Sequence, residues 1–360
     1  MFTLHIGRNK AGSSTIQAYL AANEAAIARA GVVVPRLVKP TPAGHQFWAT
    51  SLRRGGPMDE GERAAYAEAF AAVAARPATE RFLVSSEFLF ELAPERIRGL
   101  AGALSGHRVR LVLYLRDYPS WLASVYAQMT RKGANVDDVD TLARKLIDRT
   151  LARFPGQLAA WAEAFGDAAL HVRTLDPASL EGGDLVEDAL AAAGLGRAVV
   201  AAHGGTSAAA EEEERRNVSP PWHAIETVRA VAAALRPSLG AGRGFGQRKG
   251  EVRRLLRAVA GWQAEIGAGN APVPYLTPQQ FAEARQLFER DVALANARMA
   301  DFAIPLDTPE PPPPRRATPS IDLVPAAQRR EIAARLAADP FVAGLAADLR
   351  VRLLSRVAGG

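Results

Sequence analysis

Residues 2–15 read FTLHIGRNKAGSST, an apolar run followed by a glycine-containing loop and a cluster of hydroxyl side chains. The run Phe2–Ile6 predicts a strand, and the residues from Ser13 onward begin a pattern typical of a helix. Gly7 and Gly12 allow backbone N–H groups in the turn to approach anionic oxygens. The start of the helix adds partial positive charge at the same point. The stretch therefore predicts a strand, a phosphate-binding loop and a helix in succession.

The position of the lysine in this loop limits the kind of phosphate chemistry. Nucleotide-hydrolysing loops carry Lys directly after the second glycine, where it reaches the β- and γ-phosphates. That position is Ser13 here, and the lysine is Lys10, two residues before Gly12. Asp117 follows a predicted strand and could imitate the acidic residue that binds Mg²⁺ in kinases. Ser13 thus disfavours a small-molecule kinase, which stays an alternative, as does a turn that binds no ligand.

Apolar runs and amphipathic segments alternate over most of the chain, a pattern typical of an α/β fold. Five runs are predicted strands: Phe2–Ile6, Val32–Val34, Phe82–Val84, Leu111–Leu115 and Leu170–Arg173. The run LVLYL at 111–115 is apolar throughout, as expected of a parallel strand that is covered on both faces. Helices are predicted after Pro119 and after the capping residue Asp184. We expect a three-layer α/β sandwich with a central parallel sheet, similar to P-loop nucleotide-binding folds.

The C-terminal part of the sequence predicts a linker and a tail. Residues 310–316 include four consecutive prolines, which form neither helix nor sheet, so 306–320 are expected to be a stiff linker. It would join an α/β domain of residues 1–305 to a helical tail of residues 321–360, with one or two amphipathic helices over about 326–357. The tail has regularly spaced apolar positions: Ile332, Leu336, Phe341, Leu345 and Leu349. These predict burial against the domain, against a second copy in an oligomer, or against a partner.

The composition is that of a globular protein, with 360 residues, 48% of them hydrophobic and 23% charged. The chain has no cysteine, which excludes disulfides, thiolate metal ligands and a cysteine nucleophile. Its net charge of +6 suits an anionic ligand but is too mild and dispersed to indicate nucleic-acid binding. We expect no secretory signal, because the first predicted strand is not preceded by a basic region and an apolar core, and no apolar run is long enough to span a bilayer. We therefore expect a cytoplasmic protein.

A second set of candidate residues follows the predicted strand at 111–115. Arg116 emerges at the carboxyl end of that strand, and Ser124 comes eight residues later on the next helix. Ligands of open parallel sheets bind outside the carboxyl ends of the strands. An arginine fork and a hydroxyl in this place would suit a second phosphate. The alternative is a local ion pair for Arg116 and a helix-surface position for Ser124.

Together the two sets resemble the sulfotransferases that use 3′-phosphoadenosine 5′-phosphosulfate (PAPS). That family has a loop with a leading Lys, a small residue, Gly and hydroxyls, as in Lys10–Thr15, and an Arg and a Ser eight residues apart, as in Arg116 and Ser124. The stretches LHIGRNKAGSSTIQAYL, FLVSSEFLF, LVLYLRDYPSWLASVYAQM and EGGDLVEDAL are similar to bacterial members in particular. The resemblance covers roughly residues 1–300. Pro119 departs from the pattern, because many members place this proline two residues after the Arg rather than three.

The resemblance implies in-line transfer of a sulfuryl group from PAPS to a hydroxyl or amine, with no obligatory metal. Lys10 would stabilise the leaving phosphate oxygen. The residues implied to hold the 5′-phosphosulfate are Gly7, Lys10, Ala11, Gly12, Ser13, Ser14 and Thr15. The expected acceptor is a hydroxyl-bearing molecule, with a saccharide favoured. A sulfotransferase-like protein that binds nucleotide or glycan without turnover is the non-enzyme alternative.

An acceptor hydroxyl needs a base near the sulfur. Glu87 is the first candidate, because it lies just past the predicted strand at 82–84 and family members often carry a Glu or His base in that region. The alternative for Glu87 is a carboxylate that binds backbone donors at a helix N-terminus. His45 is the second candidate, in a stretch expected to be flexible, where a surface histidine is the alternative.

A tripeptide late in the chain also matches the family. Arg248, Lys249 and Gly250 correspond to residues that cytosolic members use to hold the 3′-phosphate. The residues that follow do not match. The alternative is that 236–250, rich in Gly and Arg, form a mobile and solvated basic loop.

Overall fold

The computed structural model describes residues 1–38, 44–53, 58–208, 210–212, 220–239, 248–267, 275–299, 302–306, 313 and 317–359. The chain forms two compact units, each built from segments that are distant in sequence. Unit 1 comprises Met1–Asp117, Ala152–Val218 and Gln286–Thr308, and unit 2 comprises Tyr118–Leu151, Ser219–Arg285 and Pro309–Gly360. This division differs from the predicted one, because unit 2 combines the predicted tail with two segments from inside residues 1–305. Most of the predicted proline-rich linker lies outside the described residues.

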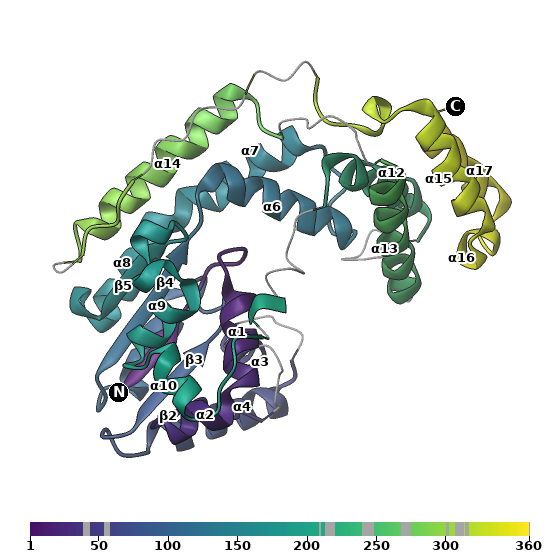
Figure 1. Ribbon diagram of the computed structural model, residues 1–360. Coiled ribbons are helices and arrows are strands. Elements are labelled where there is room, and N and C mark those ends of the chain that lie inside the picture. The colour runs from purple at the N-terminus through teal and green to yellow at the C-terminus, as the bar shows by residue number, and fades with distance from the viewer. Residues whose placement is uncertain are drawn as a thin grey trace. The chain divides into compact units, whose positions relative to one another are not determined.

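Unit 1 is built on a five-stranded parallel sheet with the order β2-β3-β1-β4-β5 (Figure 1). The strands are β1 (Phe2–His5), β2 (Val32–Val33), β3 (Arg81–Ser85), β4 (Val109–Leu115) and β5 (Leu170–Thr174). All five predicted strands are confirmed, with ends that shift by about two residues at most, as is usual for element boundaries. Helices flank the sheet on both faces, as expected of a parallel sheet.

The strands alternate between the two faces. On β1, Phe2 stacks on Phe82 of β3 and contacts Phe70 of α4 (Glu60–Ala74). On the opposite face, the Thr3 hydroxyl donates to the Ala192 carbonyl of α9 (Leu185–Ala192). The second face is covered by α1 (Ser13–Ala22), α2 (Glu24–Arg29), α9 and α10 (Arg197–Ala202). The other helices of unit 1 include α3 (Gln46–Ser51), α5 (Pro94–Ala103), α8 (Phe154–Phe165) and the last part of α14 (Pro278–Asn296).

Helix α9 is fixed to the sheet by a buried polar contact. The Tyr114 hydroxyl of β4 donates to Asp188 Oδ2 at 2.6 Å, and Arg173 Nε of β5 lies 3.6 Å from Asp188 Oδ1. Burial and the neighbouring Asp188 raise the pKa of Tyr114 well above its usual value, so the phenol stays protonated and keeps donating. As predicted, Asp184 caps α9 by accepting from the Glu187 N–H. The start of α9 is therefore held in place beside α1.

Unit 2 is helical among the residues that are described. Its helices are α6 (Tyr118–Arg131), α7 (Val139–Arg149), α12 (Trp222–Leu239), α13 (Lys249–Ile266), the first part of α14 (Pro278–Asn296), α15 (Ala326–Ala338), α16 (Pro340–Ala343) and α17 (Ala347–Ala358). Short 3₁₀ turns occur in both units: η1 (Leu151–Arg153), η2 (Asp167–Ala169), η3 (Pro177–Ser179), η4 (Glu181–Gly183) and η6 (Ile321–Leu323). In none of the described ranges is a helix both long and apolar enough to cross a membrane.

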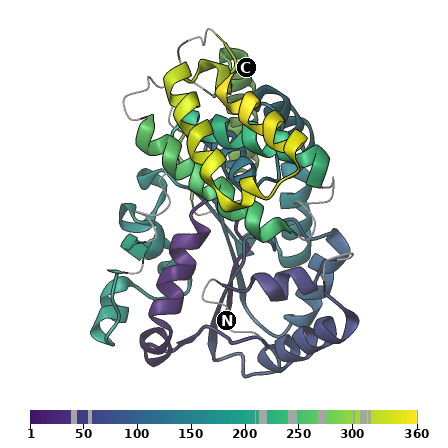
Figure 2. The ribbon, with the colours of Figure 1, turned by 90° about the vertical axis from the view of Figure 1, so that its right-hand side faces the viewer.

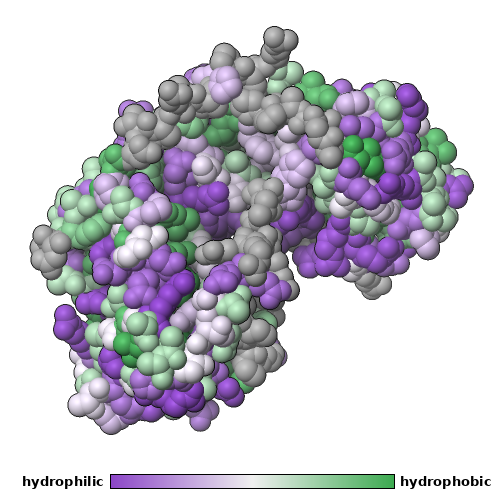
Figure 3. Space-filling view, in the orientation of Figure 1, coloured by the Kyte–Doolittle hydropathy of each residue, from purple (hydrophilic) through white to green (hydrophobic). Residues whose placement is uncertain are grey.

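The tail is part of the hydrophobic core of unit 2. The five apolar positions predicted for burial are all buried, and they cluster with apolar residues of α12 and α13 such as Val231, Leu235, Leu255 and Leu256. Figures 1 and 2 show α15 and α17 beside α12 and α13, and the outer face of these helices in Figure 3 is mainly hydrophilic. Of the three alternatives for the tail, the structure shows burial against its own chain.

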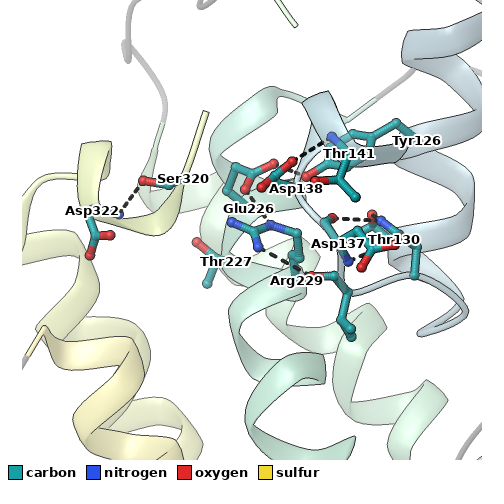
Figure 4. A network of polar contacts seen from close by, with 12 residues as sticks. Tyr126, Thr130, Asp137, Asp138, Thr141, Glu226, Thr227, Arg229, Ser320 and Asp322 are labelled. Carbon is teal, nitrogen blue, oxygen red and sulfur yellow. Dashed lines mark hydrogen bonds and ion pairs between the residues drawn. The ribbon is translucent and has the colours of Figure 1, made fainter. Parts of the chain in front are cut away.

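A buried carboxylate joins α6 to α12 inside unit 2 (Figure 4). Glu226 is 0% exposed, and it accepts hydrogen bonds from the Tyr126 hydroxyl at 2.5 Å and from Arg229 Nε at 2.8 Å. Burial raises the pKa of Glu226, and the Arg229 guanidinium opposes this effect. Because the charge is paired and hydrogen-bonded, the cost of burying it is offset.

Helices occupy both ends of the predicted basic loop, residues 236–250. Helix α12 continues through Arg236 to Leu239, and α13 begins at Lys249. The two ends of the predicted loop are therefore helical, a correction to the prediction, and residues 240–247 lie outside the described residues.

The docking of the tail predicts a difference between two neighbours on α17. Leu353 is 0% exposed and Val351 is 61% exposed. Leu353→Ala should lower the free energy of unfolding of unit 2 by about 2–5 kcal/mol, because it leaves a cavity in the core. Val351→Ala should change it by less than about 0.5 kcal/mol. Urea unfolding followed by circular dichroism measures both, and equal effects would contradict the docked tail.

Candidate functional site

The loop between β1 and α1 depends on residues with positive φ. Gly7, Lys10 and Gly12 have φ values of 44°, 64° and 76°. A Cβ on Gly12 would lie 2.2 Å from Cδ2 of Leu185, at the start of α9. Gly12 is therefore required both by its conformation and by the close approach of α9 to α1.

The start of α1 carries backbone N–H and hydroxyl donors for which no described residue provides an acceptor. Gly12 is the N-cap and supplies no side-chain cap, and the N–H groups of Ser13 and Ser14 donate to no acceptor in the described part of the chain. The Ser13 hydroxyl is in a residue only 6% exposed, and it too has no partner among the described residues. Buried polar groups are nearly always hydrogen-bonded. These donors form a site suited to an anion at a helix start.

The other residues predicted for this loop lie around the same point. Lys10 is partly exposed and Ser14 is exposed, while Ala11 and Thr15 are buried. The N–H of Ala11 donates to Arg8 and that of Thr15 to Gly12, so their own loop uses these two donors.

Gly7 is the point where the loop meets the candidate base. A Cβ on Gly7 would lie 3.1 Å from each of three atoms, which are Cα of Glu87, Nε2 of His5 and Oγ of Ser13. The structure thus brings Glu87 next to the predicted phosphate loop, at the carboxyl ends of β1 and β3. Glu87 lies in a turn at which no helix begins, so the alternative that it caps a helix is wrong.

Two glutamines orient the Glu87 carboxylate. Its Oε2 accepts from Gln17 Nε2 at 3.1 Å and from Gln46 Nε2 at 3.4 Å. Gln17 Nε2 also donates to Ser85 Oγ at 3.2 Å, and Gln17 Oε1 accepts from Gln46 at 2.8 Å. The other oxygen, Oε1 of Glu87, accepts no hydrogen bond from the described part of the chain. One carboxylate oxygen is therefore anchored and the other is available.

His5 is a buried neutral histidine beneath the loop. It is 1% exposed, and its Nδ1 lies 2.7 Å from Ser85 Oγ, while Nε2 has no partner among the described residues. Burial lowers the pKa of His5 to about 4, because the charged ring would lose its hydration. Near pH 7 it is therefore an uncharged group that faces Gly7.

His45 lies close by, but both of its ring nitrogens are engaged. Its Nε2 is 2.8 Å from the Pro35 carbonyl, and its Nδ1 accepts from the Ser85 N–H at 3.1 Å. The ring is buried, and this burial lowers its pKa. His45 therefore joins β3 to the segment after β2, and because it is buried, the alternative of a surface histidine is wrong. As a base it would have to give up one of these bonds.

Arg116 and Ser124 fall in different compact units. Arg116 follows β4 in unit 1, and none of the described carboxylates forms a salt bridge with it. Burial lowers the pKa of Arg116, and the charge of Asp117 opposes this effect. Ser124 is 5% exposed on α6 in unit 2, so its alternative as a helix-surface residue is wrong.

The tripeptide Arg248, Lys249 and Gly250 begins helix α13 in unit 2 rather than forming a loop. Arg248 Nε lies 2.9 Å from Glu251 Oε2, and its guanidinium lies 4.4 Å from the centre of the Phe341 ring. A Cβ on Gly250 would meet nothing within 4 Å, so no contact requires glycine there. Local contacts account for Arg248, and they do not favour a phosphate cradle.

Sequence reasoning missed His5, Gln17, Gln46 and Ser85 as parts of the site. Gln17 lies one turn after Ser13, and His5 and Ser85 each end a strand that leads to a candidate segment. Strand alternation and helical spacing are the signals that point to them. The pairing that sets His5 opposite Ser85 is visible only in the structure.

The burial of His5 predicts its pH behaviour. The unfolded chain would bind a proton on His5 below its ordinary pKa of 6.5, and the folded chain only below about 4. The contribution of His5 to stability is therefore full above pH 6.5 and is lost as the pH falls toward 4, by about 1.4 kcal/mol per pH unit. In an NMR titration the His5 ring, identified by its absence in His5→Gln, should not titrate between about pH 8 and pH 5. A midpoint near 6.5 would contradict the burial.

No family model matches the chain, and neither the curated proteins nor the solved structures contain a match to it.

Proposed function

We propose that the protein is a sulfotransferase that moves a sulfuryl group from PAPS to a hydroxyl or amine of a small acceptor. The observation that carries this proposal is the start of α1, where the buried Ser13 hydroxyl and uncapped N–H groups lie in the same loop as Lys10. Unsatisfied donors at a helix start favour a phosphate group. The resemblance of residues 10–15, with Ser13 where a kinase loop has lysine, favours a phosphosulfate over a nucleoside triphosphate.

The loop before α1 and the residue that follows β4 would bind different phosphates of the nucleotide. The backbone N–H groups of Ser13 and Ser14, with the hydroxyl of Ser13, suit the 5′-phosphate. Arg116, half-buried and without a salt bridge to a described carboxylate, suits the 3′-phosphate. Ser124 is assigned to the same phosphate only because it lies eight residues after Arg116.

The transfer is a single in-line displacement at sulfur. The acceptor oxygen forms a bond to sulfur as the bond between sulfur and the 5′-phosphate oxygen breaks, and the electron pair stays on that oxygen. The product nucleotide is 3′-phosphoadenosine 5′-phosphate, and Lys10 stabilises the charge that develops on it. The acceptor proton passes to Oε1 of Glu87, whose Oε2 is held by Gln17 and Gln46.

The role of Lys10 predicts a loss of nucleotide affinity. Lys10→Ala should weaken the binding of 3′-phosphoadenosine 5′-phosphate by roughly 10- to 100-fold, because a charge-assisted hydrogen bond is removed. Calorimetric titration measures this, with Lys132→Ala, a change at an exposed lysine, as the control. If the wild type bound this nucleotide no better than Lys10→Ala, or preferred ATP with Mg²⁺, the proposal would be wrong.

The role of Glu87 predicts a loss of turnover with binding intact. Glu87→Gln keeps the amide contacts near Gln17 but cannot take a proton, so turnover should fall by about 10²- to 10⁴-fold while nucleotide affinity is unchanged. Glu91→Gln, at an exposed glutamate four residues later, is the matched control and should keep full turnover. Full turnover in Glu87→Gln would remove it as the base.

A further inference from the structure

A pocket of about 490 Å³ opens in unit 1 beside the Gln17 network. Its walls come from α1, from the segment after β2, from α3 and from α4. Most of the lining is apolar: Leu20, Ala21, Val34, Pro35, Leu37, Phe47, Trp48 and Tyr66. The volume and the apolar lining are those of a small-molecule site.

One face of α1 connects this pocket to the phosphate loop. Ser13, Gln17 and Ala21 are spaced by four residues and therefore lie on the same side of the helix. Gln17 is about 6 Å along the helix axis from Ser13. Gln17 and Ser85 line the pocket and also belong to the network that holds Glu87. Glu87 is not itself a lining residue, but one hydrogen bond from the lining residue Gln17 connects it to the pocket.

Most polar side chains of the pocket are hydrogen-bonded within the protein, whereas the Trp48 indole N–H has no partner among the described residues. Gln17 uses its amide on Ser85, Glu87 and Gln46, and His45 uses both ring nitrogens. At the other end, Arg36 is paired with Glu24 through two hydrogen bonds of 2.8 and 2.9 Å. A saccharide would bury more hydroxyls in such a site than the remaining polar groups can pair, which weakens its binding.

The aromatic walls favour a flat apolar body instead. Phe47 is 44% exposed, and Trp48 stacks on Phe70 with ring centres 4.5 Å apart, which keeps the indole ring fixed. Aromatic side chains contribute large apolar contact areas and favourable ring geometries to a bound ring.

We propose that this pocket is the acceptor site, and that the acceptor is phenol-like, an aromatic body with one hydroxyl directed toward Gln17, Ser85 and Glu87. This inference rests on the proposed function, and it replaces the saccharide favoured by the sequence. The step is the displacement described above, with the phenol oxygen as the nucleophile.

The proposal can be tested by placing a large side chain on the face of α1 that lines the pocket. Ala21 lines the pocket and Ala22 does not, and both are exposed in the last turn of the helix. Ala21→Trp should weaken the binding of 2-naphthol at least 10-fold by calorimetry, while the affinity for 3′-phosphoadenosine 5′-phosphate stays within 2-fold, which also shows that α1 is folded. Ala22→Trp should leave both affinities unchanged. With PAPS, the wild type should form naphthyl sulfate and Ala21→Trp should form much less.

The failures of the two proposals are distinguishable. If the wild type bound the nucleotide but not 2-naphthol, or bound N-acetylglucosamine in preference, the phenol-like acceptor would be ruled out and the sulfotransferase would stand. Equal binding of 2-naphthol by Ala21→Trp and the wild type would likewise reject the pocket. If the nucleotide did not bind at all, the proposed function would fail, and the acceptor role of the pocket with it.

Discussion

The parallel pairing of β1 with β3 is the constraint on which the site depends. It sets His5 opposite Ser85 and places the backbone at Glu87 against Gly7, where the loop leaves the sheet. Because the two strands run in the same direction, both of their following segments emerge at one edge. The loop between β1 and α1 and the residue Glu87, some 80 residues apart in sequence, thereby meet at Gly7. The same pairing supplies the hydroxyl of Ser85, which links the buried histidine to Gln17.

The buried polar side chains at this edge differ in whether all of their polar atoms are hydrogen-bonded. This difference distinguishes structural residues from candidate binding residues. His45 is buried with every ring nitrogen engaged, which suits a residue that holds two segments together. Ser13 and His5 are equally buried but keep an atom without a partner among the described residues. Such atoms are costly in a folded protein unless a ligand or an ordered water completes them. The Ser13 hydroxyl lies at the start of α1, beside the N–H groups that donate to no described acceptor.

Much of the fold could be predicted from local pattern. The strand at 111–115 and the turn at 7–15 can each be predicted from the residues within the segment, because a covered strand needs only a continuous apolar run and a tight turn only its glycines. The two ends of the segment 236–250 were wrongly predicted to be loop, because Gly and Arg are typical of loops. The helices α12 and α13 extend into the segment from either side. Within the site, the sequence predicted a role for Glu87 but not its hydrogen-bond partners Gln17 and Gln46. Their meeting depends on strand order and on the path of α3, which no local window contains. The tail was predicted to be amphipathic, but its partner surface on α12 and α13 lies about 60 residues or more away in sequence.

The interleaving of the two units has a consequence for how the protein is made. The chain passes between units after Asp117, Leu151, Val218, Arg285 and Thr308. The apolar faces of α12 and α13 are covered by helices that begin only at Ala326, so on the ribosome these faces stay open until residues 326–357 have been synthesised. Exposed apolar helices in a nascent chain are prone to aggregation. Unit 2 therefore completes its core last, and during synthesis it is the part of this protein most in need of a chaperone.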